Sequence, residues 1–373
     1  MLNEDNAVKY HYGEFPPKNL KYDRVLIEHL LSATDSLARY DQMLKGLHNS
    51  EILLAPMRDQ EAIISSRIEG TFSTIDEILK HEADSKGEEG EFLATRDDVI
   101  ETVLYRRALK NAQLAIEDGY PLSQSLIKGL HKQLLLFGRG ASKSPGEYKK
   151  EQNYLAGKAK KEILFVPIAP EHLQSGMDTL FDYIENGDAS ILIRAALTHL
   201  EFEALHPFKD GNGRIGRMLI TLMLWRFNQI SAPHFYISRY FEEHKNEYID
   251  KMRGVSENSD WESWCIFFLE AIKQQSEQNL CIAESITELY EELKLTFTEI
   301  LGTRWSVIAL DYFFTNPIFR NNKFTSDAGI PFSTAHRISR ELTSKGILRT
   351  IAESSGRRPA MYAFEPLLEL VRV

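Results

Sequence analysis

The chain has 373 residues, of which 43% are hydrophobic, so it can form two or three domains with sizeable cores. No apolar run is long enough to span a bilayer, no signal-peptide pattern opens the chain, and Cys265 and Cys281 are the only cysteines, so we expect a cytoplasmic protein without membrane attachment or a disulfide framework. The net charge of −10 argues against a protein that binds nucleic acid over its whole surface.

The first clear element is a helix predicted over about residues 56–70, which begins near Pro56 and ends at Gly70 as a C-terminal cap. Ser65 and Glu69 are four residues apart and therefore share one face of this helix. On these residues alone, the segment could be a helix end with one solvated glutamate. A charged, glycine-containing stretch, residues 82–91, then predicts an exposed loop.

A β-hairpin is predicted over about residues 155–167. Its tip is the glycine- and lysine-rich segment 157–161, its second strand is 163–166, and Pro167 ends that strand. The pattern alone is equally consistent with an ordinary surface hairpin.

The most informative segment is a loop between two apolar helices. The first helix is predicted over 190–205 and should end near His206, because Pro207 disfavours a helical conformation in the residue before it. Gly211-Asn212-Gly213 can bring backbone N–H groups close to a ligand, and a second helix is predicted from Arg214. The start of a helix carries unpaired N–H groups and binds anions.

The side chains of this loop can each serve part of a phosphoryl-group reaction. His206 can accept a proton from a hydroxyl, and Asp210 offers an oxygen ligand suited to Mg²⁺. Asn212, the N–H groups of Gly211 and Gly213, and the two arginines Arg214 and Arg217 can bind phosphates. The less specific alternatives are a structural loop, and a zinc site made by His199, Glu203 and His206, whose ligand spacing is incomplete.

The string HPFKDGNGRIGR, His206–Arg217, resembles the Fic signature HxFx(D/E)GNGRxxR at every fixed position. The resemblance implies transfer of AMP from ATP to a protein hydroxyl, with His206 as general base and Asp210 as the Mg²⁺ ligand. It further implies that Asn212 contacts phosphate, that Arg214 lies near the β-phosphate, and that Arg217 binds the γ-phosphate.

The segment Ser65–Gly70 resembles the inhibitory motif (S/T)xxxE(G/N) of Fic proteins that carry their regulatory helix at the N-terminus. The resemblance implies that Glu69 pairs with Arg217 and excludes the γ-phosphate, and breaking such a desolvated pair costs about 3–5 kcal/mol. It also implies that the hairpin is a flap over the nucleotide that adds a strand to the target. Lys149 and Ile168 depart from the family pattern, in which arginine and proline are frequent.

Downstream, Tyr240 and Tyr248 are candidates for the adenine pocket, although helix packing explains them equally well. Many family members have a Tyr-Tyr pair where this chain has Tyr248 followed by Ile249. Both interpretations of the two tyrosines, adenine contact and helix packing, therefore stay open.

The C-terminal segment 320–373 contains nine Lys or Arg and five Asp or Glu, a balance of +4 in an otherwise acidic chain. Its pattern predicts two short helices, the second capped by Ser333, and two strands around the turn 354–359. This order resembles a winged helix, which can bind DNA or dock proteins, and the two interpretations remain equal. The DNA-contact candidates are His336, Arg337, Arg340, Arg357 and Arg358.

The predicted fold is mainly α, with a Fic-type helical core, a β-hairpin flap and a small C-terminal winged-helix α/β domain. The expected boundaries are 1–110, 111–235, 236–300 and 301–373. We expect a self-inhibited protein adenylyltransferase that uses ATP and Mg²⁺ on a Ser, Thr or Tyr of a target protein, and the resemblance suggests a homodimer. The alternatives are an ATP-sensing transcriptional regulator, or a Fic enzyme that transfers another phosphate-linked group or removes AMP.

Overall fold

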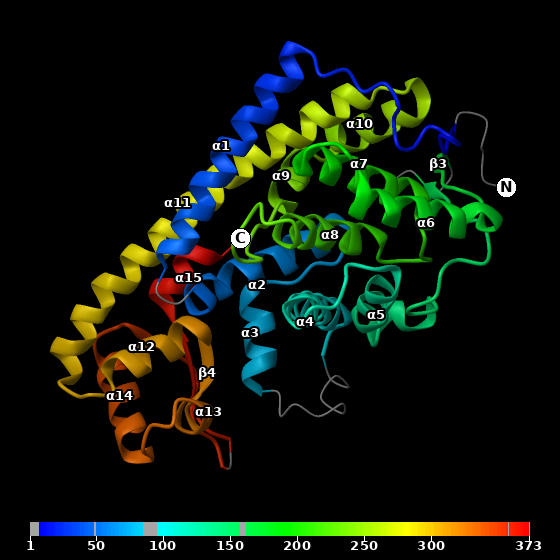
Figure 1. The fold of residues 1–373 in the computed structure, drawn as a ribbon. Helices are drawn as coiled ribbons and strands as arrows, with labels where there is room; N and C mark the ends of the chain where they lie inside the picture. The colour runs from blue at the N-terminus through cyan, green and yellow to red at the C-terminus, as the bar shows by residue number, and fades with distance from the viewer. Residues whose placement is uncertain (1–6, 48–49, 85–94, 157–161, 357, 373) are drawn as a thin grey trace.

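The computed structural model describes residues 7–47, 50–84, 95–156, 162–356 and 358–372 (Figure 1). The molecule is mainly helical, as predicted, and two small sheets complete it. Two long helices, α1 (Arg24–Gly46) and α11 (Trp261–Leu301), pack along each other at one side of the molecule. In the described ranges, no helix is both long enough and apolar enough to cross a membrane.

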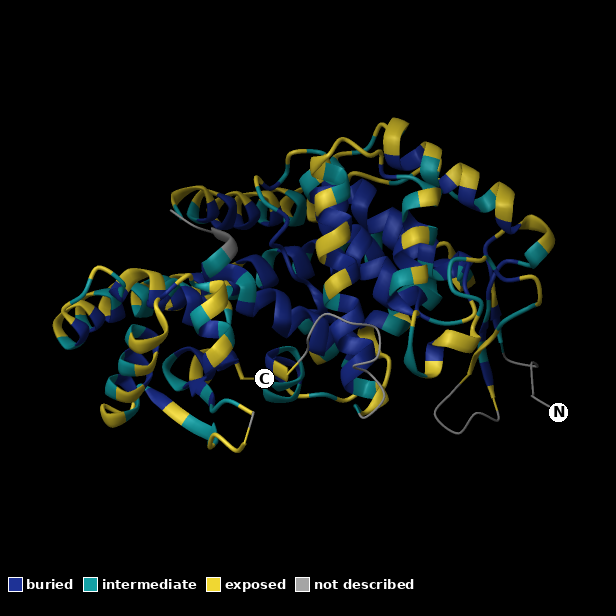
Figure 2. Cartoon of the chain, turned by 90° about the horizontal axis from the view of Figure 1, so that it is seen from below, coloured by how far each residue is buried: buried dark blue, intermediate teal, exposed yellow. Residues whose placement is uncertain are grey.

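The centre of the molecule is formed by α7 (Ile191–Leu205) and α8 (Asn212–Arg226). Their side chains are apolar on nearly every face, so they are stable only when neighbouring helices surround them. The buried positions accordingly gather in these inner helices (Figure 2). The helices that pack against them include α11, α4 (Asp97–Glu117), α5 (Gln124–Leu134) and α6 (Pro170–Asn186). Two further helices, α9 (Ser238–Glu243) and α10 (Lys245–Asn258), pack against α11.

The segment expected to be inhibitory forms α2 (Ser50–Ile68), and α3 (Ile75–Asp84) follows it. The helix begins six residues before the predicted start, and Pro56 lies inside it. The apolar residues before the proline explain the difference, because Leu53 and Leu54 are buried in the core. Gly70 has a φ of 85°, which agrees with its predicted role as the C-terminal cap.

The first sheet contains the two predicted hairpin strands. β2 (Leu155–Ala156) and β3 (Ile163–Val166) pair antiparallel, and the tip of the hairpin, 157–161, lies outside the described residues. A third strand that was not predicted, β1 (Val8–Lys9), pairs parallel with β3, with Val8 opposite Phe165. The N-terminal strand β1 thus pairs with the edge of β3 that β2 leaves free.

The C-terminal part folds around a second three-stranded sheet of order β4-β6-β5. The helices and strands predicted there are present, but Ser333 does not cap a helix, because α14 begins at Phe332 and no side chain caps it. The boundary expected after residue 300 coincides with the end of α11, whereas the boundary expected after residue 110 falls inside α4. The elements are α12 (Ser306–Thr315), β4 (Ile318–Arg320), α13 (Asn321–Asp327), α14 (Phe332–Ser344), β5 (Leu348–Ala352), β6 (Met361–Phe364) and α15 (Glu365–Val371).

Candidate functional site

The motif loop, residues 206–211, connects the end of α7 to the start of α8. His206 adopts a left-handed conformation with φ 45° and ends α7, as Pro207 predicted. Gly211 has φ 80° and precedes α8, which begins at Asn212, two residues before the predicted start. The loop therefore aims the unpaired N–H groups at the start of α8 toward the same side as His206.

His206 lines a pocket of about 340 Å³, together with Glu69, Glu203, Gly213 and Arg217. Its Nδ1 atom is buried and has no hydrogen-bond partner. Burial, and next the charge of Lys149, lower the pKa of His206 to about 4. The imidazole is consequently unprotonated at neutral pH, the form that can accept a proton. The remaining walls come from β2, β3, the end of α2, α7 and α10.

Arg217 is held by the end of α2. Its Nη2 donates to Glu69 Oε1 at 2.8 Å and to the Ser65 carbonyl at 2.8 Å, while its Nε donates to Ser65 Oγ at 2.9 Å. Burial opposes the charge of Glu69, but the Arg217 guanidinium outweighs this effect and holds the pKa of Glu69 below its usual range. The carboxylate reaches the start of α8, because a Cβ added at Gly213 would lie 2.1 Å from Glu69 Oε1.

The cost of separating Glu69 from Arg217 is smaller than the value of about 3–5 kcal/mol expected for a fully desolvated pair. The Glu69 side chain is 35% exposed, whereas that of Arg217 is 1% exposed. Solvent screening of the carboxylate reduces the cost of separating the pair to about 1–3 kcal/mol. A ligand that offers Arg217 an equivalent anion can therefore compete with Glu69.

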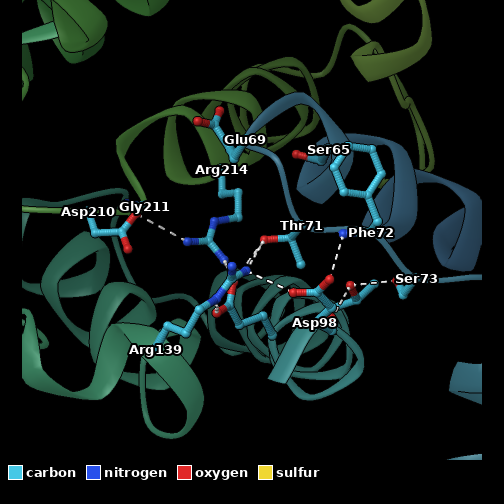
Figure 3. A network of polar contacts seen from close by, with 12 residues as sticks. Ser65, Glu69, Thr71, Phe72, Ser73, Asp98, Arg139, Asp210, Gly211 and Arg214 are labelled. Carbon is cyan, nitrogen blue, oxygen red and sulfur yellow. Dashed lines mark hydrogen bonds and ion pairs between the residues drawn. The ribbon is translucent and has the colours of Figure 1, made fainter. Parts of the chain in front are cut away.

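Arg214 lies one turn before Arg217 but belongs to a different network (Figure 3). Its Nη1 contacts Glu101 Oε2 of α4 at 3.4 Å, and Glu101 also accepts from Thr71 at 2.9 Å and from Arg139 at 3.0 Å. Its Nη2 contacts Asp210 Oδ1 at 3.4 Å, and its Nε atom is buried without a partner. One guanidinium thus has a buried counterion and retains an unused donor beside the loop.

Asp210 and Asn212 play different parts in the loop. The Asp210 side chain is 42% exposed, and its Oδ1 accepts from the Gly211 N–H at 2.6 Å. A single accessible carboxylate beside a phosphate site suits Mg²⁺, which takes its other ligands from phosphates and water. The Asn212 side chain closes the loop instead, because it bonds the Phe208 N–H and carbonyl, both at 2.8 Å. The phosphate contact expected for Asn212 stays a prediction, and its side-chain amide is engaged with Phe208 in this structure.

Of the two tyrosines suggested for an adenine pocket, Tyr248 lines the pocket and Tyr240 does not. Tyr248 and Ile249 line the pocket, and the Tyr248 hydroxyl lies 2.8 Å from His199 Nε2. Tyr240 packs against His244 with ring centroids 4.0 Å apart and is not among the pocket residues, so helix packing explains it. The zinc alternative finds no support, since the described residues contain no group of three or more His, Cys, Asp or Glu placed so that it could hold a metal ion.

Several residues that bind the motif loop were not predicted from the sequence. Lys149 and Asn153 bind three carbonyl groups of the loop and the carbonyl of Leu205 just before it, and His131 Nε2 lies 2.9 Å from the Asp210 carbonyl. Glu101 binds Arg214. The only signal in the sequence was the departure from the family pattern at Lys149.

The candidates for DNA contact differ in exposure and partners. His336 and Arg340 are exposed on α14. Arg337 is half-buried and bonds the Leu301 carbonyl at 3.4 Å and Glu341 at 3.1 Å, so its charge is engaged within the chain. Arg358 pairs with Asp84 of α3 at 3.0 Å, and Arg357 lies outside the described residues.

The fold and the motif loop define a mainly helical domain with two buried arginines in the first turns of its central helix. The Fic/DOC family model matches residues 121–224, and the model of the Fic/DOC family N-terminal region matches residues 27–114. The chain belongs to the Fic/DOC family.

Two curated relatives and one solved structure illustrate the relationship. The protein adenylyltransferase Fic of Nematostella vectensis is 30% identical over 133 residues, 35% of this chain and 27% of that protein. The probable protein adenylyltransferase of Aquifex aeolicus is 28% identical over 259 residues, 68% of this chain and 71% of that protein. The chain spans only about a quarter of the length of the first curated relatives that it matches.

A crystal structure of a Fic family protein from Desulfovibrio desulfuricans superposes with a TM-score of 0.59 at 17% identity. The superposition covers 92% of this chain and 97% of that chain. This similarity extends the agreement in fold beyond the two segments that the family models match.

Proposed function

We propose that the protein is a self-inhibited adenylyltransferase that transfers AMP from ATP to the hydroxyl of a Ser, Thr or Tyr side chain of a target protein. The observation that carries the proposal is the shared pocket of His206 and Arg217. A base that is unprotonated at neutral pH and a guanidinium that can receive a phosphate face the same space. The names of the relatives support this activity.

In the proposed step, the target's hydroxyl oxygen attacks the α-phosphorus of ATP. The bond between that phosphorus and the oxygen bridging to the β-phosphate breaks, pyrophosphate leaves, and the hydroxyl proton passes to His206. The N–H groups at the start of α8 and the guanidiniums of Arg214 and Arg217 neutralise the phosphate charge. Mg²⁺ held by Asp210 would supply further charge neutralisation between the phosphates.

Glu69 supplies the inhibition in this proposal. Its carboxylate occupies the Arg217 guanidinium at 2.8 Å, where the γ-phosphate would bind. Ser65 strengthens the arrangement, because it accepts two further bonds from the same guanidinium. ATP then binds without its α-phosphorus reaching the hydroxyl and His206, and withdrawal of the end of α2 restores the productive position.

The test measures incorporation of label from α-labelled ATP with Mg²⁺ into the protein itself and into lysate proteins. We expect Glu69→Gly to raise incorporation at least tenfold over wild type, corresponding to more than about 1.4 kcal/mol. The double variant Glu69→Gly/His206→Ala should return incorporation to background. Mass spectrometry should find an increment that matches AMP.

Glu117→Gly is the matched control, because it replaces another glutamate at a helix end, far from the pocket in sequence and exposed. Its incorporation should equal that of wild type. Label from γ-labelled ATP rather than α-labelled ATP would indicate transfer of a different group. Absence of any label with Glu69→Gly would contradict the proposed activity.

A further inference from the structure

Four consecutive backbone carbonyls, from the last residue of α7 into the motif loop, are bound by two residues of one distant segment. The Lys149 ammonium donates to the Leu205 carbonyl at 3.0 Å, and the Lys149 N–H donates to the Pro207 carbonyl at 2.8 Å. The Asn153 amide donates to the carbonyls of His206 and Phe208, both at 3.0 Å. No carbonyl from Leu205 to Phe208 is therefore left without a donor.

The two side chains also bind each other. Lys149 Nζ donates to Asn153 Oδ1 at 2.7 Å, which fixes the orientation of the amide and directs its NH₂ group at the loop. Lys149 is only 3% exposed. A buried ammonium is costly unless acceptors surround it, so its two acceptors define where it can lie.

This set of bonds stabilises an unfavourable backbone conformation. His206 has φ 45°, a left-handed value that costs a non-glycine residue about 1 kcal/mol or more. The strained residue is the same one whose side chain faces the pocket. Since its own carbonyl and both neighbouring carbonyls are bound, the imidazole is placed by contacts outside the motif.

The same segment is connected to the hairpin. Gln152 donates to the Asn153 carbonyl and to the Pro167 carbonyl, both at 3.0 Å. Pro167 directly follows β3, which lines the pocket opposite the motif loop. One short segment, 149–153, thus sets the spacing between two walls of the pocket.

The charge of Lys149 acts on His206 in addition to these bonds. The other charged or titratable groups that line the pocket with the imidazole are Glu69 from the end of α2, Glu203 from α7, Arg217 from α8, and Lys245, Tyr248 and Arg253 from α10. Burial lowers the pKa of Lys149 to about 7, so below neutral pH, where His206 would otherwise gain a proton, the ammonium is charged. After burial, Lys149 is the largest cause of the lowered pKa of His206.

We propose that Lys149 and Asn153 are positioning residues for His206: together they fix the backbone that aims the imidazole, and the Lys149 ammonium, bound to the carbonyl of the residue before His206, disfavours a positive charge on the imidazole. The role of His206 as the base rests on the proposed function, whereas its placement by these two residues does not. The proposal assigns different effects to the two residues, because Asn153 carries no charge.

The first measurement follows the titration of His206 by NMR in histidine-labelled Glu69→Gly protein, and His206→Ala identifies the signal. We expect Lys149→Gln to raise the pKa of His206 by about half a unit to one unit, because a neutral side chain no longer repels the imidazolium. Lys149→Arg, which retains the charge, should leave the titration at the parent's pH. Lys150→Gln is the matched control, since its exposed side chain pairs with Glu147 instead.

The second measurement is kcat for AMP transfer as a function of pH in the same background. Lys149→Gln should move the acidic limb of this pH profile to higher pH by the same amount, and Lys149→Arg should have its acidic limb at the pH of the parent. Asn153→Ala should lower kcat about tenfold or more with its acidic limb unmoved, because only the aim of the imidazole changes. Thermal denaturation establishes that each variant is folded.

An unchanged His206 titration in Lys149→Gln, or the parent's kcat in Asn153→Ala, would overturn the proposal. If Lys149→Gln does not fold, the kcat of Asn153→Ala tests whether this segment positions His206. If the Glu69→Gly parent transfers no AMP while the His206 titration shifts as expected, the proposed function fails and the action of Lys149 on His206 stands.

Discussion

Two sets of polar contacts in the molecule are built in opposite ways. Beneath the motif loop, His131 and Lys149 are buried and bind backbone carbonyls. Between α3 and the C-terminal part, several polar contacts are ion pairs with at least one exposed member, such as Arg372 with Asp76 at 3.1 Å and Arg358 with Asp84 at 3.0 Å.

The difference has an energetic consequence. Cutting a buried hydrogen bond leaves a group that water cannot reach, which costs about 1–3 kcal/mol, whereas an exposed ion pair contributes about 0–1 kcal/mol and is screened by salt. The backbone conformation around His206 is therefore stabilised by buried hydrogen bonds, as the core is. The ion pairs between the C-terminal part and α3, which follows the inhibitory segment, should instead weaken as salt is added.

The largest effect should come from the buried interface. His131→Ala removes a ring that stacks on Phe208 with centroids 3.7 Å apart, accepts from the Gly146 N–H at 2.8 Å and bonds the Asp210 carbonyl. We expect a loss of about 3–4 kcal/mol in the free energy of unfolding, measured by urea denaturation. His29→Ala, whose imidazole bonds only its own helix, should change stability by less than about 0.5 kcal/mol. A comparable loss of stability in His131→Ala and His29→Ala would contradict the special contribution of the buried contacts of His131.

A buried carboxyl on α2 gives an intermediate effect that depends on pH. Glu61 accepts from Tyr105 Oη at 3.1 Å and from the Ser238 hydroxyl at 2.5 Å, and burial raises its pKa to about 7. Because the folded pKa lies above the unfolded value of about 4.3, this group's contribution is full below that value and is lost as pH rises to about 7.

The test compares the stability of wild type and Glu61→Gln from pH 4.5 to 7.5 by urea denaturation. The difference between the two curves should shift by about 2–3 kcal/mol in favour of the variant as pH rises. Glu117→Gln, which removes an exposed carboxylate at the end of α4, should give a difference that varies with pH by less than about 0.5 kcal/mol. A flat difference for Glu61→Gln would mean that the carboxylate is charged and solvated in the folded protein.

The parts of the site that are contiguous in sequence could be predicted, because one loop and two apolar helices determine them. His206, Asp210, Arg214 and Arg217 lie in one string of twelve residues, and their relative placement follows from the turn and the helix start. Even there, the amide of Asn212 bonds Phe208 rather than facing the pocket, since loop closure uses both ends of that side chain.

The partners that complete the site could not be predicted, because no local pattern records a contact between distant segments. Glu101 lies 113 residues from Arg214, and Asn153 lies 53 residues from His206. The Glu69–Arg217 pair was expected only through the family resemblance. The positive balance of the C-terminal part suggested DNA contact, but the sequence could not reveal that α3 pairs with Arg320, Arg358 and Arg372.

The smallest effect is expected at this exposed interface. Asp84→Asn removes the counterion of Arg358 and of Arg320, and we expect a loss of about 1 kcal/mol at low salt that falls by roughly half near 0.5 M salt. Asp35→Asn, which breaks an exposed pair with Arg39 within α1, should cost less than about 0.5 kcal/mol. Urea denaturation at two salt concentrations measures both. The Arg320 side chain is only 9% exposed, so a loss that persists unchanged in salt would mean that its desolvated charge sets the cost. The interface would then belong with the buried contacts of the motif loop, and its docking could not be adjusted by ionic strength.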